Sequence, residues 1–328
     1  MKKIFTLMTI LLTFACGSVF AKKADSNKLK VVTTIFPEYD WAKEIIGEKS
    51  DNVELTLLLN NGVDLHSYQP SVKDIAKVSE ADIFVYVGGE SDEWVDEVLK
   101  NAKNPGMKVI NLVEVLGERV KNEEVVEGME HEHGHDEHDD DEHDEHHHEE
   151  EKDEHVWLSL RFAKTLCGAI CDALCEKDSA NANLYRKNLT SYTAKLDALD
   201  SKYADAVKAG NKNTLVFGDR FPFRYMVDDY NLKYFAAFTG CSAESEASFK
   251  TIAFLSEKVN ELGLNCVCQI ESGNGKIAKT VISNSKNKKA KVVTFDSLQS
   301  TTAKQIKKGT TYLGVMEKNL ESLKEALR

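Results

Sequence analysis

Three absences narrow the classes to which this chain can belong. Beyond residue 21 there is no apolar run of the roughly 20 residues that a membrane-spanning helix needs. There is no Cys-x-x-Cys pair, so neither a thiolate zinc site nor a thioredoxin-like redox centre is expected. The one adjacent His-Ser pair, His66-Ser67, lacks the nucleophile-elbow context of a hydrolase, and we expect a protein that is not an enzyme.

Positive charge is also scarce. The chain has 42 Lys and Arg residues against 54 Asp and Glu residues, which gives a formal net charge of −12 at pH 7. Residues 130–154 carry fifteen of the acidic side chains and a single lysine, so the rest of the chain is close to neutral. Because no basic stripe is present, the sequence predicts no nucleic-acid partner.

The first 21 residues predict export. A short positive region precedes an apolar run, Ile4 to Phe14, that is too short to span a bilayer. The pattern of small residues predicts a signal segment at 1–21 that is cleaved after Ala21, and lipid modification of Cys16 is the alternative. We therefore expect an exported protein, either periplasmic or lipid-anchored at the outer face of the cytoplasmic membrane.

Six cysteines follow Cys16. Three of them recur every four residues from Cys167 to Cys175, which predicts small core residues on the inner face of an amphipathic helix. Cys266 and Cys268 alternate on an apolar strand and so point the same way. Cys241 is a candidate disulfide partner for one of these two, and the disulfide state of the three residues stays open.

Strand-like runs alternate with helix-like runs in both halves of the chain. In the first half the strand-like runs are Leu29–Ile35, Val53–Leu59, Ile83–Val87 and Lys108–Leu112. In the second half they are Leu215–Phe217, Tyr234–Phe238, Cys266–Ile270 and Val292–Phe295. This alternation predicts an α/β fold, with two Rossmann-like lobes of parallel-type sheet and flanking helices.

One long linker helix is predicted between the lobes. Its apolar stripe has alternating spacings of three and four residues, and Asp178 and Gly210 provide an N-cap and a stop. About 30 residues at 1.5 Å each span roughly 45 Å, enough to pack along both lobes. The rival interpretation is a coiled-coil seam, but the stripe is short and partly tyrosine, so we expect a monomer. The predicted domains are a first lobe at 28–177, the helix at 178–209 and a second lobe at 210–328.

Residues 121–154 form a low-complexity insert with almost no apolar side chains, which predicts a disordered loop in the first lobe. Its histidines are His131, His133, His135, His138, His143, His146, His147 and His148. Imidazole suits zinc, copper and nickel, and the interleaved carboxylates attract cations. Because the spacing is irregular, the loop predicts weak accessory metal binding rather than one fixed site.

Only two histidines, His66 and His155, lie outside this loop. His66 follows a predicted strand, and His155 comes directly after the acidic loop. Acidic residues follow the predicted strands of the second half: Asp219, Glu271 and Asp296. Since ligands of open α/β sheets collect at the carboxyl ends of strands, we expect these groups to face a cleft between the lobes. The metal-ligand candidates are His66, His155, Asp296 and Asp219.

The segments around these residues resemble those of the ZnuA-type family, the zinc- and manganese-binding solute receptors of ABC importers. Gly62 to Pro70 is similar to the segment with that family's first metal histidine, which falls on His66. His155-Val-Trp-Leu-Ser is similar to the segment with the family's second metal histidine, which falls on His155. Thr294 to Leu298 is similar to the segment with the acidic fourth ligand, which falls on Asp296.

The resemblance covers nearly everything from Leu29 to Arg328, and a histidine-rich acidic loop is typical of the family's zinc-specific members. One departure concerns the family's third histidine, because Gly218 stands at its place. Asp219 is a substitute oxygen ligand or, alternatively, a group paired with a neighbouring arginine. A site with fewer histidines tilts toward manganese or iron, so the identity of the third ligand stays open.

The resemblance implies an extracytoplasmic, high-affinity binding protein for a divalent metal, which it delivers to the membrane permease of an ABC transporter. Zn²⁺ is the expected ion, with Mn²⁺ or Fe²⁺ as alternatives. A manganese- or iron-binding receptor of the same type, a metal-dependent surface adhesin and a metal sponge are the alternative functions.

Overall fold

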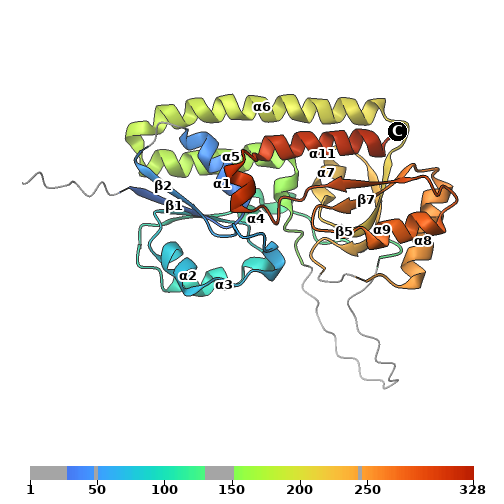
Figure 1. The fold of residues 1–328 in the computed structure, drawn as a ribbon. Coiled ribbons are helices and arrows are strands. Elements are labelled where there is room, and N and C mark those ends of the chain that lie inside the picture. Colours follow the sequence, from blue (N-terminus) through green and yellow to red (C-terminus); the bar gives the residue numbers. More distant parts are fainter. Residues whose placement is uncertain (1–27, 48–50, 130–150, 243–245) are drawn as a thin grey trace, which may run out of the picture.

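The computed structural model describes residues 28–47, 51–129, 151–242 and 246–328, and in them the strands form two parallel sheets (Figure 1). The first sheet has the order β2 (Val53–Leu57), β1 (Leu29–Thr33), β3 (Ile83–Tyr86), β4 (Lys108–Asn111). The second has the order β6 (Lys233–Thr239), β5 (Thr214–Phe221), β7 (Cys266–Ile270), β8 (Lys291–Phe295). Neighbouring strands pair in parallel throughout, which confirms the predicted two-lobed α/β class.

Helices cover both faces of each sheet (Figure 1). The first lobe contains α1 (Phe36–Ile46), α2 (Val72–Ser79), α3 (Trp94–Lys100), α4 (Leu112–Leu116) and α5 (Leu160–Lys177). The second contains α7 (Arg224–Asp229), α8 (Phe249–Glu261), α9 (Lys276–Asn284), α10 (Ala303–Lys307) and α11 (Tyr312–Ala326). Among the described residues, no helix combines the length and the apolar character needed to cross a membrane.

The long helix α6 (Ala182–Ala209) runs along both lobes (Figure 1). It packs against α1 and α5 of the first lobe and against α11 of the second. Its regular turns begin at Ala182, four residues after the predicted start at 178, because a 3₁₀ turn (Ser179–Asn181) comes first. Asp178 is not its N-cap, because the Asp178 carboxylate accepts hydrogen bonds from the side chains of Asn181 and Tyr185 (both 2.7 Å) and from no backbone N–H of the first turn.

Cysteines are buried in both lobes. Cys167, Cys171 and Cys175 lie on the buried face of α5, which confirms their predicted core position. Cys266 and Cys268 are buried in β7. Every described cysteine is free, so Cys241 forms no disulfide with either of the β7 cysteines.

The histidine-rich insert lies mostly outside the described residues, as does the expected signal segment at 1–21. The stretches that flank residues 130–150 are described and make defined contacts, although the sequence analysis placed them in the loop. The Lys121 N–H donates to the Tyr225 hydroxyl (3.1 Å), and this hydroxyl donates to the carbonyl of Asp153 (2.7 Å). Both flanks are therefore held against α7 of the second lobe.

One apolar core spans both lobes, and a smaller one lies within the second lobe. Trp157, which is fully buried, donates its Nε1–H to the carbonyl of Ser297 at 2.8 Å. The Tyr312 hydroxyl at the start of α11 donates to the carbonyl of Trp157 at 2.6 Å. The Tyr312 N–H donates to Asp40 in α1 at 2.8 Å. These contacts join elements of the first lobe to the segment between β8 and α11, so the lobes are packed as one unit.

We expect Asp40 to make the free energy of unfolding depend on pH. Burial raises the pKa of its carboxyl to about 6, above the value of about 3.9 expected in an unfolded chain. Between about pH 4 and pH 6 the folded state therefore binds more protons, and stability falls as pH rises through this window. In Asp40→Asn, whose amide oxygen can still accept from Tyr312, we expect a smaller fall, measured by urea unfolding at several pH values.

The matched control for this prediction is Asp51→Asn, because Asp51 is exposed. The control should retain the pH dependence of the wild type. An unchanged slope of stability against pH in Asp40→Asn would show that Asp40 does not cause it.

Candidate metal centre

His66 lies on the 3₁₀ turn Leu65–Ser67, on the chain between β2 and α2. Asp64 caps this turn by accepting the His66 N–H at 3.2 Å, and its other carboxylate oxygen accepts from Arg220 of the second lobe at 2.8 Å. The His66 Nδ1 lies 2.7 Å from the Ser91 hydroxyl. Since Nδ1 is engaged there, the ring directs Nε2 toward the second lobe.

His155 is fully buried just before the 3₁₀ turn Val156–Leu158. One oxygen of Asp153 accepts both the backbone N–H of His155 (2.9 Å) and its ring Nδ1–H (2.8 Å). A carboxylate on Nδ1 sets the tautomer and leaves a lone pair on Nε2, the state in which a histidine binds metal. A Cβ at Gly240 would lie 2.7 Å from Cε1 of this ring, so glycine is required where β6 ends against His155.

The two imidazoles converge, although they are 89 residues apart in sequence. Their Nε2 atoms are 3.1 Å apart, and the Gln299 side-chain amide lies 2.9 Å from one and 2.7 Å from the other. A tetrahedral zinc ion with Zn–N bonds of about 2.0–2.1 Å holds two nitrogens about 3.3 Å apart. The spacing of the two nitrogens thus suits two ligands of one ion.

A third group completes this cluster. The Sγ of Cys241, which follows β6, lies with the ring nitrogens of His66 and His155 so that the three ligand atoms are all within 4.8 Å of one another. In the part of the chain that the structure describes, no other set of three or more His, Cys, Asp or Glu residues is arranged in this way.

Burial shapes the charge states of the cluster. Burial and the neighbouring His155 lower the pKa of His66 to about 3, so this ring is neutral at pH 7. Burial also disfavours the charged form of His155, but the carboxylates of Asp153, Glu154 and Glu123 together outweigh burial and raise its pKa. Burial raises the pKa of the Cys241 thiol. The site therefore offers at least one neutral imidazole without the loss of a proton.

The two predicted carboxylates do not join the cluster. Both oxygens of Asp219 are engaged by backbone N–H groups, one by Arg220 (2.9 Å) and one by Ile270 (3.3 Å). Asp296 accepts the N–H of Leu298 at 2.9 Å. Burial raises the pKa of both carboxyls. Among the predicted site residues that the structure describes, it thus brings together only His66 and His155.

The place of the missing histidine is closed by packing. A Cβ at Gly218 in β5 would lie 2.6 Å from Cα and 2.7 Å from the backbone nitrogen of Ala278 in α9. These are backbone atoms, so no side-chain rotation can make room. A histidine at this position would require α9 to move away from the sheet, and the tight contact between α9 and β5 explains the glycine.

Sequence reasoning missed Cys241 and Gln299. Cys241 lies two residues after the end of β6, and Gln299 lies four residues after the end of β8. Each therefore follows the carboxyl end of a strand in a parallel sheet, where ligands collect. That rule drew attention to the acidic residues, but it applies equally to a thiol and an amide.

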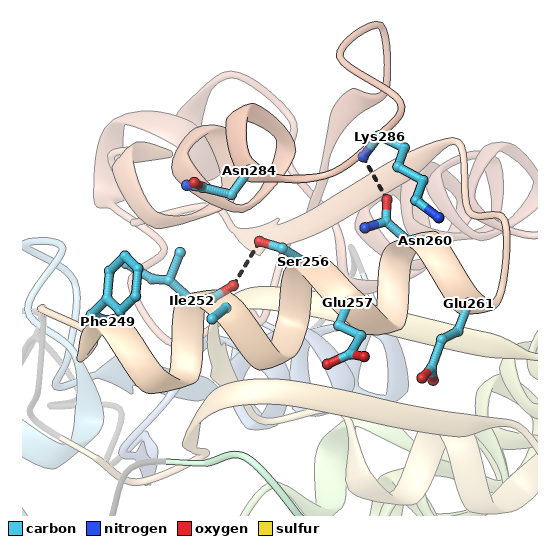
Figure 2. Close-up of a pocket in the computed structure, with 9 residues that line it drawn as sticks. Phe249, Ile252, Ser256, Glu257, Asn260, Glu261, Asn284 and Lys286 are labelled. Carbon is cyan, nitrogen blue, oxygen red and sulfur yellow. Dashed lines mark hydrogen bonds between the residues drawn. The ribbon is translucent and has the colours of Figure 1, made fainter.

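Two of the surface hollows involve the second lobe, one adjoining the site and one lying away from it. One, of about 270 Å³, is lined by Asp64 and Ser67 from the His66 turn and by Asp219 and Arg220, so it lies between the lobes. The other, of about 460 Å³, lies along α8 (Figure 2). There Ser256 donates to the carbonyl of Ile252 and Asn260 accepts from Lys286, and none of the lining residues belongs to the metal-ligand cluster.

Comparisons with known proteins match nearly the whole chain. The family described as "ZnuA: Zinc-uptake complex component A periplasmic" matches residues 31–326. The high-affinity zinc uptake system protein ZnuA of Bacillus subtilis is 33% identical over 320 residues, which cover 97% of this chain and 94% of that protein. The zinc-binding protein AdcA of Streptococcus pyogenes is 32% identical over 98% of this chain.

Solved structures share the fold. The Zn(II)-bound ZnuA-like domain of Streptococcus pneumoniae AdcA is 28% identical, with a TM-score of 0.68, over 92% of this chain and 99% of that one. The metal-dependent lipoprotein YcdH of Bacillus subtilis is also 28% identical, with a TM-score of 0.71, over 92% of this chain and 99% of that one. The chain spans about three fifths (61%) of the length of the AdcA relatives.

Proposed function

Since the chain belongs to the ZnuA family of zinc-uptake components, we propose that it captures one zinc ion between its lobes and delivers it to the permease of an ABC importer. The observation that carries the proposal is the convergence of His66 and His155, whose Nε2 atoms lie 3.1 Å apart. Zinc suits neutral imidazole ligands, and the Nδ1 partners of both rings leave Nε2 available.

Several features favour binding over catalysis. A catalytic zinc site keeps an open position for water and places a general base beside it. Here the amide of Gln299 lies directly against both imidazoles, and His155 is fully buried. The proposal therefore assigns the protein no enzymatic role, and the zinc ion is its cargo.

The setting of the protein is part of the proposal. The family description names a periplasmic component, and the relative from Streptococcus pneumoniae is described as a zinc-binding lipoprotein. We infer that this chain too works as a monomer outside the cytoplasm, whether it is freed by cleavage after Ala21 or anchored through Cys16.

Calorimetric titration of metal-stripped protein with zinc tests the function. We expect one tight equivalent in addition to weaker binding, and no hydrolytic turnover. Many weak equivalents without a tight one would indicate a metal sponge and would contradict the proposal. Zinc accumulation by cells with and without the gene, compared at limiting zinc, tests delivery separately.

Residues 130–150 lie outside the described residues, and their role is proposed from the sequence. We propose that the eight histidines from His131 to His148 gather zinc weakly and raise its local concentration. Replacing 130–150 by a Gly/Ser linker of equal length should remove several weak equivalents and slow zinc association at low salt, because the dense negative charge is lost. Titration and stopped-flow measurements would show both effects.

The tight site is the internal control for this prediction. Its affinity should stay within about tenfold, or 1.4 kcal/mol, of the wild type. A greater loss would show that the insert supplies a ligand to the tight site.

A further inference from the structure

We propose that the Sγ of Cys241 is the third protein ligand of the bound ion, and that the site therefore prefers zinc and other thiophilic divalent ions to manganese. This inference rests on the proposed function and names the class of ion that the same site selects. The third ligand position, for which the sequence offers no histidine, is thereby assigned to a cysteine.

The backbone holds Cys241 at the cluster. Its N–H donates to Glu123 Oε1 at 3.0 Å, and the carbonyl of the next residue, Ser242, accepts from Arg220 at 3.3 Å. The same Arg220 side chain bonds to Asp64, which caps the turn that carries His66. One chain of contacts thus ties the segment with Cys241 to the turn with His66.

The preceding residue allows the thiol to come close to the second histidine. Gly240 has no side chain, and a Cβ there would lie 2.7 Å from Cε1 and 3.0 Å from Nδ1 of His155. The backbone at the end of β6 can therefore lie directly against this ring. The result is that Sγ and one ring nitrogen of each histidine lie within 4.8 Å of one another, so that side-chain rotation can bring all three onto one ion.

Other candidates for the third position are already engaged. Gly218 has no room for a side chain, and Asp219 uses both oxygens on backbone N–H groups. Cys241 itself is free, since no disulfide joins it to the β7 cysteines. Gln299 contacts both imidazoles through its amide nitrogen, and its oxygen accepts from the Ser297 hydroxyl at 3.1 Å, so a flip of the amide is needed to turn the oxygen toward the ion as a fourth, neutral ligand.

A thiolate changes which ions the site accepts. When the ion binds, the thiol proton leaves to solvent and a sulfur lone pair forms the bond to the metal. Soft thiolate ligands favour zinc over manganese, which prefers carboxylate, carbonyl and water oxygens. A site with two histidines and one cysteine therefore disfavours manganese. A missing histidine alone would instead have favoured manganese or iron.

The test uses cobalt(II) as a spectroscopic substitute for zinc in metal-stripped full-length protein. A thiolate ligand produces a sulfur-to-cobalt charge-transfer band in the near ultraviolet, and we expect this band in the wild type. It should be absent in Cys241→Ser and retained in the matched control Cys175→Ser, whose thiol is buried in α5 away from the cluster. Far-ultraviolet circular dichroism would check that each variant is folded.

Affinities measured by competition with a chromophoric chelator provide the second readout. Zinc affinity should fall by about a hundredfold or more in Cys241→Ser, since loss of an outer-shell partner alone costs about 10–100-fold. Manganese affinity should change far less, so the zinc-to-manganese ratio should fall.

The outcomes separate this inference from the proposed function. A wild type that binds zinc tightly without the cobalt band, together with unchanged zinc affinity in Cys241→Ser, overturns the thiolate ligand and leaves the zinc-binding function intact. A wild type without tight zinc binding overturns the proposed function itself. The spectrum of the wild type decides the ligand even if the serine variant does not fold.

Discussion

Replacing His155 by alanine is expected to weaken zinc binding at the tight site by more than about a hundredfold. The variant loses a nitrogen ligand, and losing a mere outer-shell partner of a metal ligand already costs about 10–100-fold. It also leaves Asp153 without the Nδ1–H that it now accepts at 2.8 Å. Competition with a zinc chelator, at matched pH and ionic strength, measures the change.

His143→Ala is the matched control, because it removes the same side chain from the histidine-rich segment. Its tight affinity should equal that of the wild type. The histidine pair would be excluded as the zinc site if His155→Ala and His143→Ala bound the tight equivalent equally well.

Replacing Trp157 by alanine is expected to destabilise the fold by about 3–5 kcal/mol, the cost typical of removing a large buried aromatic side chain. Trp157 is fully buried, and its indole N–H satisfies the carbonyl of Ser297, a residue that is itself fully buried. Alanine would leave a cavity between the lobes and an unpaired buried carbonyl, each of which lowers stability. Urea unfolding of metal-free protein measures the change.

Trp94→Ala serves as the comparison, since Trp94 is only partly buried at the start of α3. It should cost less than Trp157→Ala. If the two variants had the same stability, the Trp157 contacts would not be the main link between the lobes. The ring of Trp157 also lies 5.3 Å from that of His155, centroid to centroid, so Trp157→Ala should weaken zinc binding as well.

The sequence by itself determined the architecture of this protein. Alternating strand-like and helix-like runs predicted two α/β lobes with parallel sheets. One apolar stripe with the 3.6-residue period of a helix predicted the helix that joins the lobes. These signals are local, because the periodicity of apolar residues reports directly which face of an element is buried. The signal for the metal-binding histidines is local too, because His66 and His155 are the only histidines outside the acidic segment.

Only the tertiary structure decided which side chains gather around the two histidines. Cys241 and Gln299 reach the cluster from loops after β6 and β8, and their approach depends on the order of strands in the second sheet. Gly218 is excluded because α9 packs against β5, a contact that no pattern near residue 218 indicates. Gln299 is 233 residues from His66 and 144 residues from His155 in sequence, and it meets them only when the lobes pack together. The positions of these side chains therefore follow from long-range packing, which local periodicity does not encode.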